Sequence, residues 1–271
     1  MIEIALCLAI IGFALVSILL VLPSGMNTQR DTREETIVGQ DASVLLEGIR
    51  NGARGMDDLT NYVYAITNTW TNFTTHAHGQ NGYTYTSFSV PGPLYPGGPY
   101  PQCTLSNGFV IIGLLSTPEY IANVVNFPDT NYPGVPSPLY AMQRYGPDIS
   151  CYGNHVVAYV RSFSGLAAEK PPQNNDIMRQ DSFSYRVLCV NAPAAMDTNM
   201  LGSFGYAAQF AGSLRELRLL FEWPQLPNGN VGAFRQNFRT SVAGELVLTN
   251  VYPNLYPQYL YQPQSFSTNL P

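Results

Sequence analysis

The sequence predicts an α+β protein in which a long hydrophobic N-terminal α-helix, kinked near Pro23, packs against a β-rich, largely antiparallel globular head. Three observations favour this class. The first 22 residues carry a single charge, on Glu3. An amphipathic pattern with the period of one helix face follows this apolar stretch. Beyond about residue 67, short β-rich runs alternate with turn residues, and one helix followed by many strands is typical of α+β domains.

The composition narrows the possible functions. Only 11% of the 271 residues are charged, whereas about 25% is usual in a soluble domain. The formal net charge is −5, and Lys170 is the one lysine among 13 basic residues. Because no stretch of the chain is basic, we expect no nucleic-acid partner. The 18 tyrosines and 13 phenylalanines also argue against a disordered chain.

The apolar run from Ile4 to Leu22 contains 19 residues and would span about 28 Å as a helix, close to the thickness of a bilayer core. A cleaved signal peptide is disfavoured, because the chain starts with an acid where such peptides carry a base and lacks a small-residue cleavage site. A single-pass anchor explains the length of the run. It does not explain Glu3, whose charge would lie uncompensated at the edge of the hydrocarbon.

Helical periodicity continues beyond Pro23, whose ring predicts a kink or a local unwinding of the helix. Apolar residues then recur mostly at intervals of three, four or seven: Ile37, Val38, Val44, Leu45, Ile49, Met56, Leu59, Val63 and Ile66. We expect this helix to break near 51–55 and to restart at 57–58, where two aspartates favour a helix N-terminus. The predicted organisation is a hydrophobic helix over residues 1–25, an amphipathic helical segment over 26–66 and a β-rich head over 67–271.

The N-terminal stretch MIEIALCLAIIGFALVSILLVLP resembles the mature N-terminus of type IV pilins and type II secretion pseudopilins. Glu3 matches the lone glutamate of that family, Gly12 the glycine inside the apolar run, and Pro23 the helix-breaking proline. Residues 22–25, ending in Gly25, also resemble the Leu-Pro-x-Gly turn of a prepilin-like subgroup. The resemblance covers roughly residues 1–50. In the family the glutamate is normally the fifth mature residue, and here it is the third. Two residues therefore precede Met1 in the mature protein, or the register is shifted.

The resemblance implies a structural subunit of an extracellular filament, without enzymatic activity or cofactor. In such filaments the apolar helices bundle into a core, and the glutamate neutralises the N-terminal amine of a neighbouring subunit. Glu3, Gly12, Pro23 and Gly25 are the assembly residues that it implies. The implied partners are further copies of the chain, the inner membrane before assembly, the prepilin peptidase and the pilus-assembly machinery. The implied location is the inner membrane for the precursor and the cell surface for the filament.

Three alternatives stay open at the level of the sequence. Within the same class, the chain is a minor pilin or a type II secretion pseudopilin. Outside it, the chain is a membrane-anchored binding or adhesion module that never polymerises. For Glu3 itself, the simpler interpretation is an acid at the membrane edge that stays solvated.

In the head, β-rich runs predict strands over 83–90, 109–116, 155–163, 183–190, 217–223 and 238–248. The runs near residues 156–160 and 185–190 are apolar enough for central strands. Alternation over 215–223 predicts one solvated face. Pro224 predicts the end of that strand, and Asn228-Gly229 a hairpin turn. Residues 91–101 and 252–263, rich in proline and tyrosine, are expected to be irregular and exposed, either at an interface or as part of the head's own surface.

The cysteines predict at most one disulfide. Cys7 lies in the apolar run and is expected to be a buried, inert thiol. Cys189 lies in an apolar strand and is expected in the core. Cys103 and Cys151 both stand beside turn residues and are the favoured pair, although three head cysteines allow three pairings.

Residues with metal or catalytic chemistry are few, and none forms a known motif. His76-x-His78 is isolated in a polar loop, and His155 begins a predicted strand. Residues 174–176 with Asp181 lack the spacing of a known calcium loop. The Asn72-Phe73-Thr74 triplet is a glycosylation signal of low specificity. We therefore expect no catalytic, metal or cofactor site.

Overall fold

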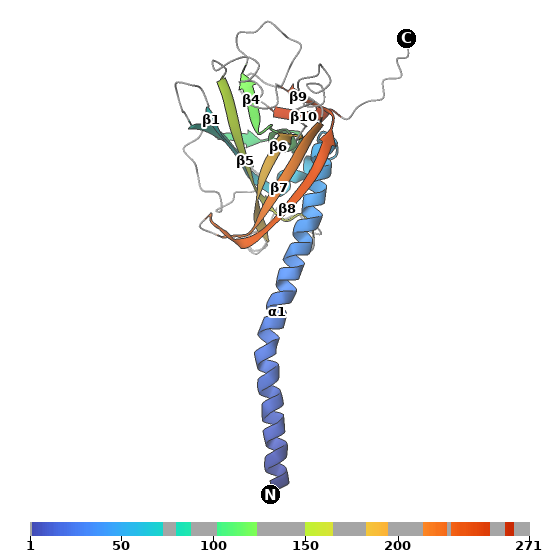
Figure 1. The fold of residues 1–271 in the computed structure, drawn as a ribbon, viewed down its shortest axis with the longest axis vertical. Coiled ribbons are helices and arrows are strands. Elements are labelled where there is room, and N and C mark those ends of the chain that lie inside the picture. The colour runs from blue at the N-terminus through green and yellow to red at the C-terminus, as the bar shows by residue number, and fades with distance from the viewer. Residues whose placement is uncertain are drawn as a thin grey trace, which may run out of the picture. The chain divides into compact units, whose positions relative to one another are not determined.

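The computed structural model describes residues 2–72, 80–87, 102–123, 150–164, 183–194, 214–226, 229–249 and 258–262. It confirms the α+β class, with a long N-terminal helix followed by a mixed, mostly antiparallel sheet (Figure 1). The chain forms two compact units, Met1–Gln40 and Asp41–Pro271. We call the second unit the head.

The first helix, α1, extends from Ile2 to Arg50 as one element, with Pro23 inside it. The predicted local unwinding at this joint does not occur, since helical structure is continuous on both sides of the proline. A proline removes only one backbone donor, and the remaining turns keep their hydrogen bonds.

The amphipathic segment ends earlier than its periodicity predicts. The break over residues 51–55 is confirmed, with positive φ at Gly52, Ala53 and Gly55, and the restart is a 3₁₀ turn, η1, over Asp57–Asn61. The extension of the helix to Ile66 is wrong, because a strand begins at Val63. Residues 63–66 are all buried. A strand buried on both faces has no alternation, so its apolar residues can match a helical interval by chance.

The main sheet has the strand order β3-β2-β1-β5-β6-β7-β8, with β4 paired to β5. Only β2 and β3 run parallel; the other pairs in the described part are antiparallel. The predicted central strands are confirmed as β5 and β6, which lie inside the sheet. The strands are β1 Val63–Asn72, β2 Gln80–Ser87, β3 Gln102–Leu105, β4 Tyr120–Asn123, β5 Ser150–Arg161, β6 Ser184–Pro193, β7 Leu214–Gln225 and β8 Val231–Ala243.

Pro224 does not end its strand as expected. β7 continues to Gln225, and its register with β8 shifts between Trp223 and Gln225. A bulge is one of the few places where a sheet accepts proline. Gly232 on β8 makes room for the ring, because a Cβ there would lie 2.5 Å from the Cδ of Pro224. The predicted β7–β8 hairpin is confirmed, and Asn228 of its turn lies outside the described residues.

Residues 109–116 were expected as a buried strand, and this is wrong. Gly108–Leu115 forms a helix, α2, whose N-terminus is capped by Asn107. The Asn107 Oδ1 accepts a hydrogen bond of 2.9 Å from the Val110 amide. A short apolar run that is buried on all sides has no periodicity to separate helix from strand. Asn107 is the local signal for the helix.

The C-terminal segment is more ordered than predicted. Gln258–Gln262 forms β10, which pairs with β9 over Glu245–Thr249. The expectation of an irregular tail is therefore wrong for these five residues, of which Leu260 and Tyr261 are buried. The predicted strand over 238–248 is divided between β8 and β9. Residues 91–101 lie outside the described part of the chain.

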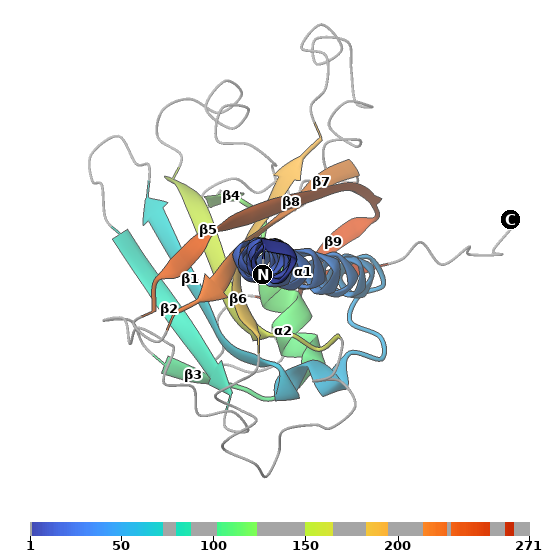
Figure 2. The ribbon, with the colours of Figure 1, turned by 90° about the horizontal axis from the view of Figure 1, so that it is seen from below.

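Most of the core of the head lies on the face of the sheet where α2 packs (Figure 2), and a smaller buried cluster contains Tyr64, Ala65 and Tyr159. The core is rich in aromatic and branched side chains: Tyr83, Tyr85, Tyr185, Phe221, Ile111 and Ile112 are fully buried. The head end of α1 contributes Ala42, Leu45 and Ile49, which are buried. The amphipathic pattern predicted this for Leu45 and Ile49, whereas Val44, which belongs to the same pattern, is exposed.

Candidate functional site

The N-terminal part of α1 exposes large apolar side chains around its whole circumference. The exposed side chains include those of Ile2, Ile4, Leu6, Leu8, Phe13, Leu15, Leu19, Leu20 and Leu22. A contiguous apolar surface of this size is rare on a soluble monomer and marks a membrane or protein contact. By its length and composition α1 can cross a bilayer. We call residues 4–22 the apolar segment.

The four predicted assembly residues all lie on α1, and all are exposed. A Cβ added at Gly12 or Gly25 meets nothing within 4 Å, so packing within the described chain does not require glycine at either position. Glu3 and Gly25 are about 33 Å apart along the helix, at about 1.5 Å per residue. The structure does not bring these residues together into one pocket. A shared role would come from contacts with other molecules.

The apolar segment satisfies its own polar group. The Ser17 hydroxyl donates to the Phe13 carbonyl oxygen at 2.9 Å, a local bond that suits a serine in a helix surrounded by hydrocarbon or protein. Cys7 is a free thiol and is exposed. The expectation that it is buried is therefore wrong within the single chain.

A buried carboxylate anchors the head end of α1. The Asp41 Oδ2 accepts hydrogen bonds from the Tyr185 hydroxyl at 2.7 Å and from the Phe163 amide at 3.3 Å. Burial raises the pKa of Asp41, and hydrogen bonds partly oppose this shift. Sequence reasoning missed this contact. Its signal was an acid four residues before Leu45, on the buried stripe of an amphipathic helix.

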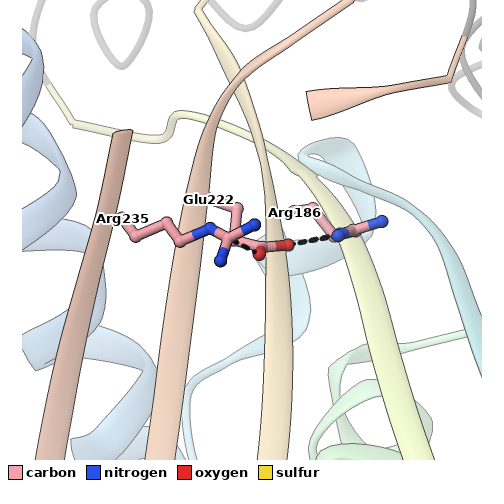
Figure 3. A network of polar contacts seen from close by, with 3 residues as sticks. All are labelled: Arg186, Glu222 and Arg235. Carbon is pink, nitrogen blue, oxygen red and sulfur yellow. Dashed lines mark hydrogen bonds and ion pairs between the residues drawn. The ribbon is translucent and has the colours of Figure 1, made fainter. Parts of the chain in front are cut away.

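Two buried glutamates on β7 each hold two arginines. Glu222 binds Arg186 of β6 and Arg235 of β8 (Figure 3). Glu216 binds Arg218 of its own strand and Arg239 of β8. The predicted solvated face of residues 215–223 is therefore wrong for the two glutamates, which are buried. The alternation in the sequence predicted which residues of β7 share a face. It did not show that long arginine side chains cover the two glutamates on that face.

A second polar cluster lies in the interior of the head. The Asn191 Oδ1 accepts hydrogen bonds from the Arg215 Nε at 2.8 Å and from the Tyr261 hydroxyl at 2.7 Å. The Asn191 Nδ2 donates to the Ser116 carbonyl oxygen at 2.6 Å. Burial lowers the pKa of Arg215. The cluster joins the end of α2 to β6, β7 and β10, which is a structural role.

The structure does not bring Cys103 and Cys151 together. Cys103 is a free thiol on β3, and Cys151 lies on β5. Strands β2 and β1 separate them, so their backbones are at least about 14 Å apart at about 4.8 Å per strand. A disulfide requires Cα atoms within about 7 Å. Cys189 is buried, as predicted.

Among the described residues, no group of three or more His, Cys, Asp or Glu side chains lies close enough to hold a metal ion. His155 is exposed on β5. His76, His78, Phe73, Thr74 and residues 174–181 lie outside the described residues, and Asn72 ends β1.

No protein-family model, no curated protein and no solved structure matches this chain. The resemblance to pilins is therefore carried by residues 1–50 alone.

Proposed function

We propose that this chain is a structural subunit of a type IV pilin-like filament and assembles through its apolar segment. The observation that carries the proposal is the all-round exposure of large apolar side chains on residues 2–22, with Glu3 as the one acid among them. In water this surface costs about 25 cal/mol per Å². Lipid covers it first, and the helices of other copies cover it in the filament.

Glu3 sets the register of this assembly. A carboxylate that enters an apolar helix bundle is tolerated only when it is paired. The N-terminal amine of a neighbouring copy is a suitable partner. Because the pair forms at only one axial offset, it also selects one arrangement of subunits, as a single buried polar residue does in a coiled coil.

The proposal includes a path through the cell. The precursor lies in the inner membrane, where the apolar segment has the length to anchor it. A prepilin peptidase processes it, and the pilus-assembly machinery extracts it into a cell-surface filament. A minor pilin or a type II secretion pseudopilin would follow the same path at lower copy number.

Substitution of Glu3 tests the proposal in cells that contain the assembly machinery. We expect Glu3→Ala to reduce filament yield at least about tenfold, since loss of a buried partner costs several kcal/mol and about 1.4 kcal/mol is a factor of ten. The membrane level of the chain should not change. Glu35→Ala is the matched control, because Glu35 is another exposed acid of the same helix. Filaments at normal yield from Glu3→Ala would overturn the role of Glu3.

Immunogold electron microscopy of the wild-type chain separates the candidate functions. Label along a continuous filament supports a main subunit. Label confined to a tip indicates a minor subunit, and label confined to the membrane indicates an anchored binding or adhesion module that does not polymerise.

A further inference from the structure

Four of the 13 basic residues lie on one face of the sheet in the head. We call Arg186, Arg218, Arg235 and Arg239 the arginine face. Arg186, Glu222 and Arg235 occupy one row across three neighbouring strands (Figure 3). Glu216, Arg218 and Glu222 alternate along β7, so their side chains project from the same face. In a chain of net charge −5 this is a local concentration of positive charge.

Arg218 and Arg239 stand directly opposite each other on β7 and β8. We call them the guanidinium pair. Directly opposed side chains have Cβ atoms about 5 Å apart, and like charges at that distance repel. One carboxylate lies between them: the Arg218 Nε and the Arg239 Nη2 both donate to Glu216. Because Glu216 alone accepts hydrogen bonds from both guanidinium groups, these three side chains together carry one net positive charge, and Glu119 adds a weaker attraction on Arg218.

The guanidinium pair also retains unused hydrogen-bond donors. Each arginine carries five N–H groups, and each donates one described bond to Glu216. The side chains of Arg218 and Arg239 are 48% and 66% exposed, whereas that of Glu216 is 7% exposed. The buried Glu216 carboxylate thus holds two guanidinium groups, each with further N–H donors, at the surface. Paired forks of this kind are the usual recognition element for carboxylates.

The second set of ion pairs on this face lacks such a pair of forks. Arg186 is 28% exposed and uses both its Nε and its Nη2 on Glu222. Arg235 is 64% exposed, like Arg239, but β7 lies between it and Arg186. Arg235 therefore offers a single accessible guanidinium group. It is a matched control for Arg239, because both lie on the same face of β8.

We propose that the guanidinium pair binds the carboxylates of Asp57 and Asp58 from a second copy of this chain. Asp57 and Asp58 are adjacent and exposed on η1, and no described residue forms an ion pair with either. Two neighbouring carboxylates are opposite in charge to the two neighbouring guanidinium groups and equal to them in number.

Such a contact joins different surfaces of the two copies, which is the heterologous type that builds open-ended helical assemblies. The inference rests on the proposed filament function and adds a head-to-head contact to it. The arginines of β8 also make pairing between two β8 edges unfavourable, because charged edge strands repel one another.

The test uses the full chain in detergent micelles, where detergent covers the apolar segment of each copy. Binding between two differently labelled chains is measured by fluorescence transfer at low salt. We expect R218E/R239E to weaken this binding at least about tenfold, and D57R/D58R to do the same. A chain that carries all four substitutions should regain most of the affinity, because each contact then has its charges exchanged. Arg235→Glu should change binding less than about threefold.

The outcomes distinguish this contact from the proposed function. Glu3→Ala should leave binding in micelles unchanged and affect only filament yield. Equal loss of binding in Arg235→Glu, or no recovery in the fourfold variant, would overturn the contact while leaving the filament proposal in place. Heparin and polygalacturonate test the alternative that the guanidinium pair binds an acidic polymer and not a second copy of the chain. Retention of the wild-type chain on either, with loss in R218E/R239E and no effect of D57R/D58R on chain–chain binding, would assign the guanidinium pair to an acidic polymer and overturn the proposal.

Discussion

At the scale of single residues, the polar side chains inside the head are the least predictable and the most informative features. Asp41 lies on the buried stripe of a helix, and its partners Phe163 and Tyr185 follow more than 100 positions later. The helical pattern places Asp41 on the buried stripe, but it does not identify the partners of the carboxylate. The guanidinium pair was equally hidden, because alternation along β7 does not indicate which residue of β8 stands opposite.

Asp41 makes the stability of the head depend on pH. Because the folded-state pKa of its carboxyl is raised, the folded state binds more protons than the unfolded state between the unfolded value, about 3.9, and the raised value. The free energy of unfolding that Asp41 contributes therefore falls as pH rises through this interval. We expect Asp41→Asn to flatten the profile there. Urea unfolding of the full chain in micelles, followed by tryptophan fluorescence at several pH values, measures it.

Tyr185→Phe provides the companion variant, because it removes a donor to the Asp41 carboxylate. It should raise the pKa of Asp41 further and destabilise the head by about 1–3 kcal/mol at neutral pH, the cost of a buried acceptor without its partner. Parallel pH profiles for the wild type and Asp41→Asn would contradict the assignment.

At the scale of elements, the sequence predicted what periodicity and turn chemistry determine. The apolar segment, the central strands β5 and β6, the β7–β8 hairpin and the break after Arg50 follow from local signals. Two of the errors share one cause, which is burial on more than one side. Residues 63–66 and 108–115 are apolar in every direction, so their pattern did not distinguish helix from strand. β10 is stabilised by the preceding strand β9 and by Asn191, which lies 70 positions from Tyr261, and its own sequence does not reveal these contacts.

The start of α2 depends on a close approach of two backbone segments. A Cβ at Gly108 would lie 2.0 Å from the Met56 carbonyl oxygen. Gly108→Ala should therefore displace η1 or α2 and destabilise the head by about 1–3 kcal/mol, the usual cost of overpacking. Gly113→Ala in the same helix meets only the Gln258 side chain, at 3.0 Å, and should cost less. Urea unfolding of the two variants in micelles compares them; an equal loss would remove the special role of Gly108.

At the scale of the whole molecule, the few charged residues are unevenly distributed, so that the chain has two surfaces of different character. The apolar segment carries no charge at all, and the head places four arginines on one face and two aspartates on η1. The proposed assembly thus has two kinds of contact with different physical chemistry. Burial of the apolar helices does not depend on screening, whereas contacts between exposed ionic groups weaken as salt shortens the Debye length, to about 3 Å at 1 M.

This difference predicts how the proposed filament dissociates. Filaments of the wild-type chain should persist in 1 M sodium chloride with softened head-to-head contacts, and should dissolve in mild detergent at low salt, because detergent replaces the neighbours of the apolar segment. Sedimentation and electron microscopy after each treatment measure the two responses, with R218E/R239E filaments as the control that should be insensitive to salt. The opposite pattern, dissolution in salt and resistance to detergent, would place the organising contacts in the head. So would a chain without residues 1–25 that forms the same polymers, since the apolar helix would then not be the core of the assembly.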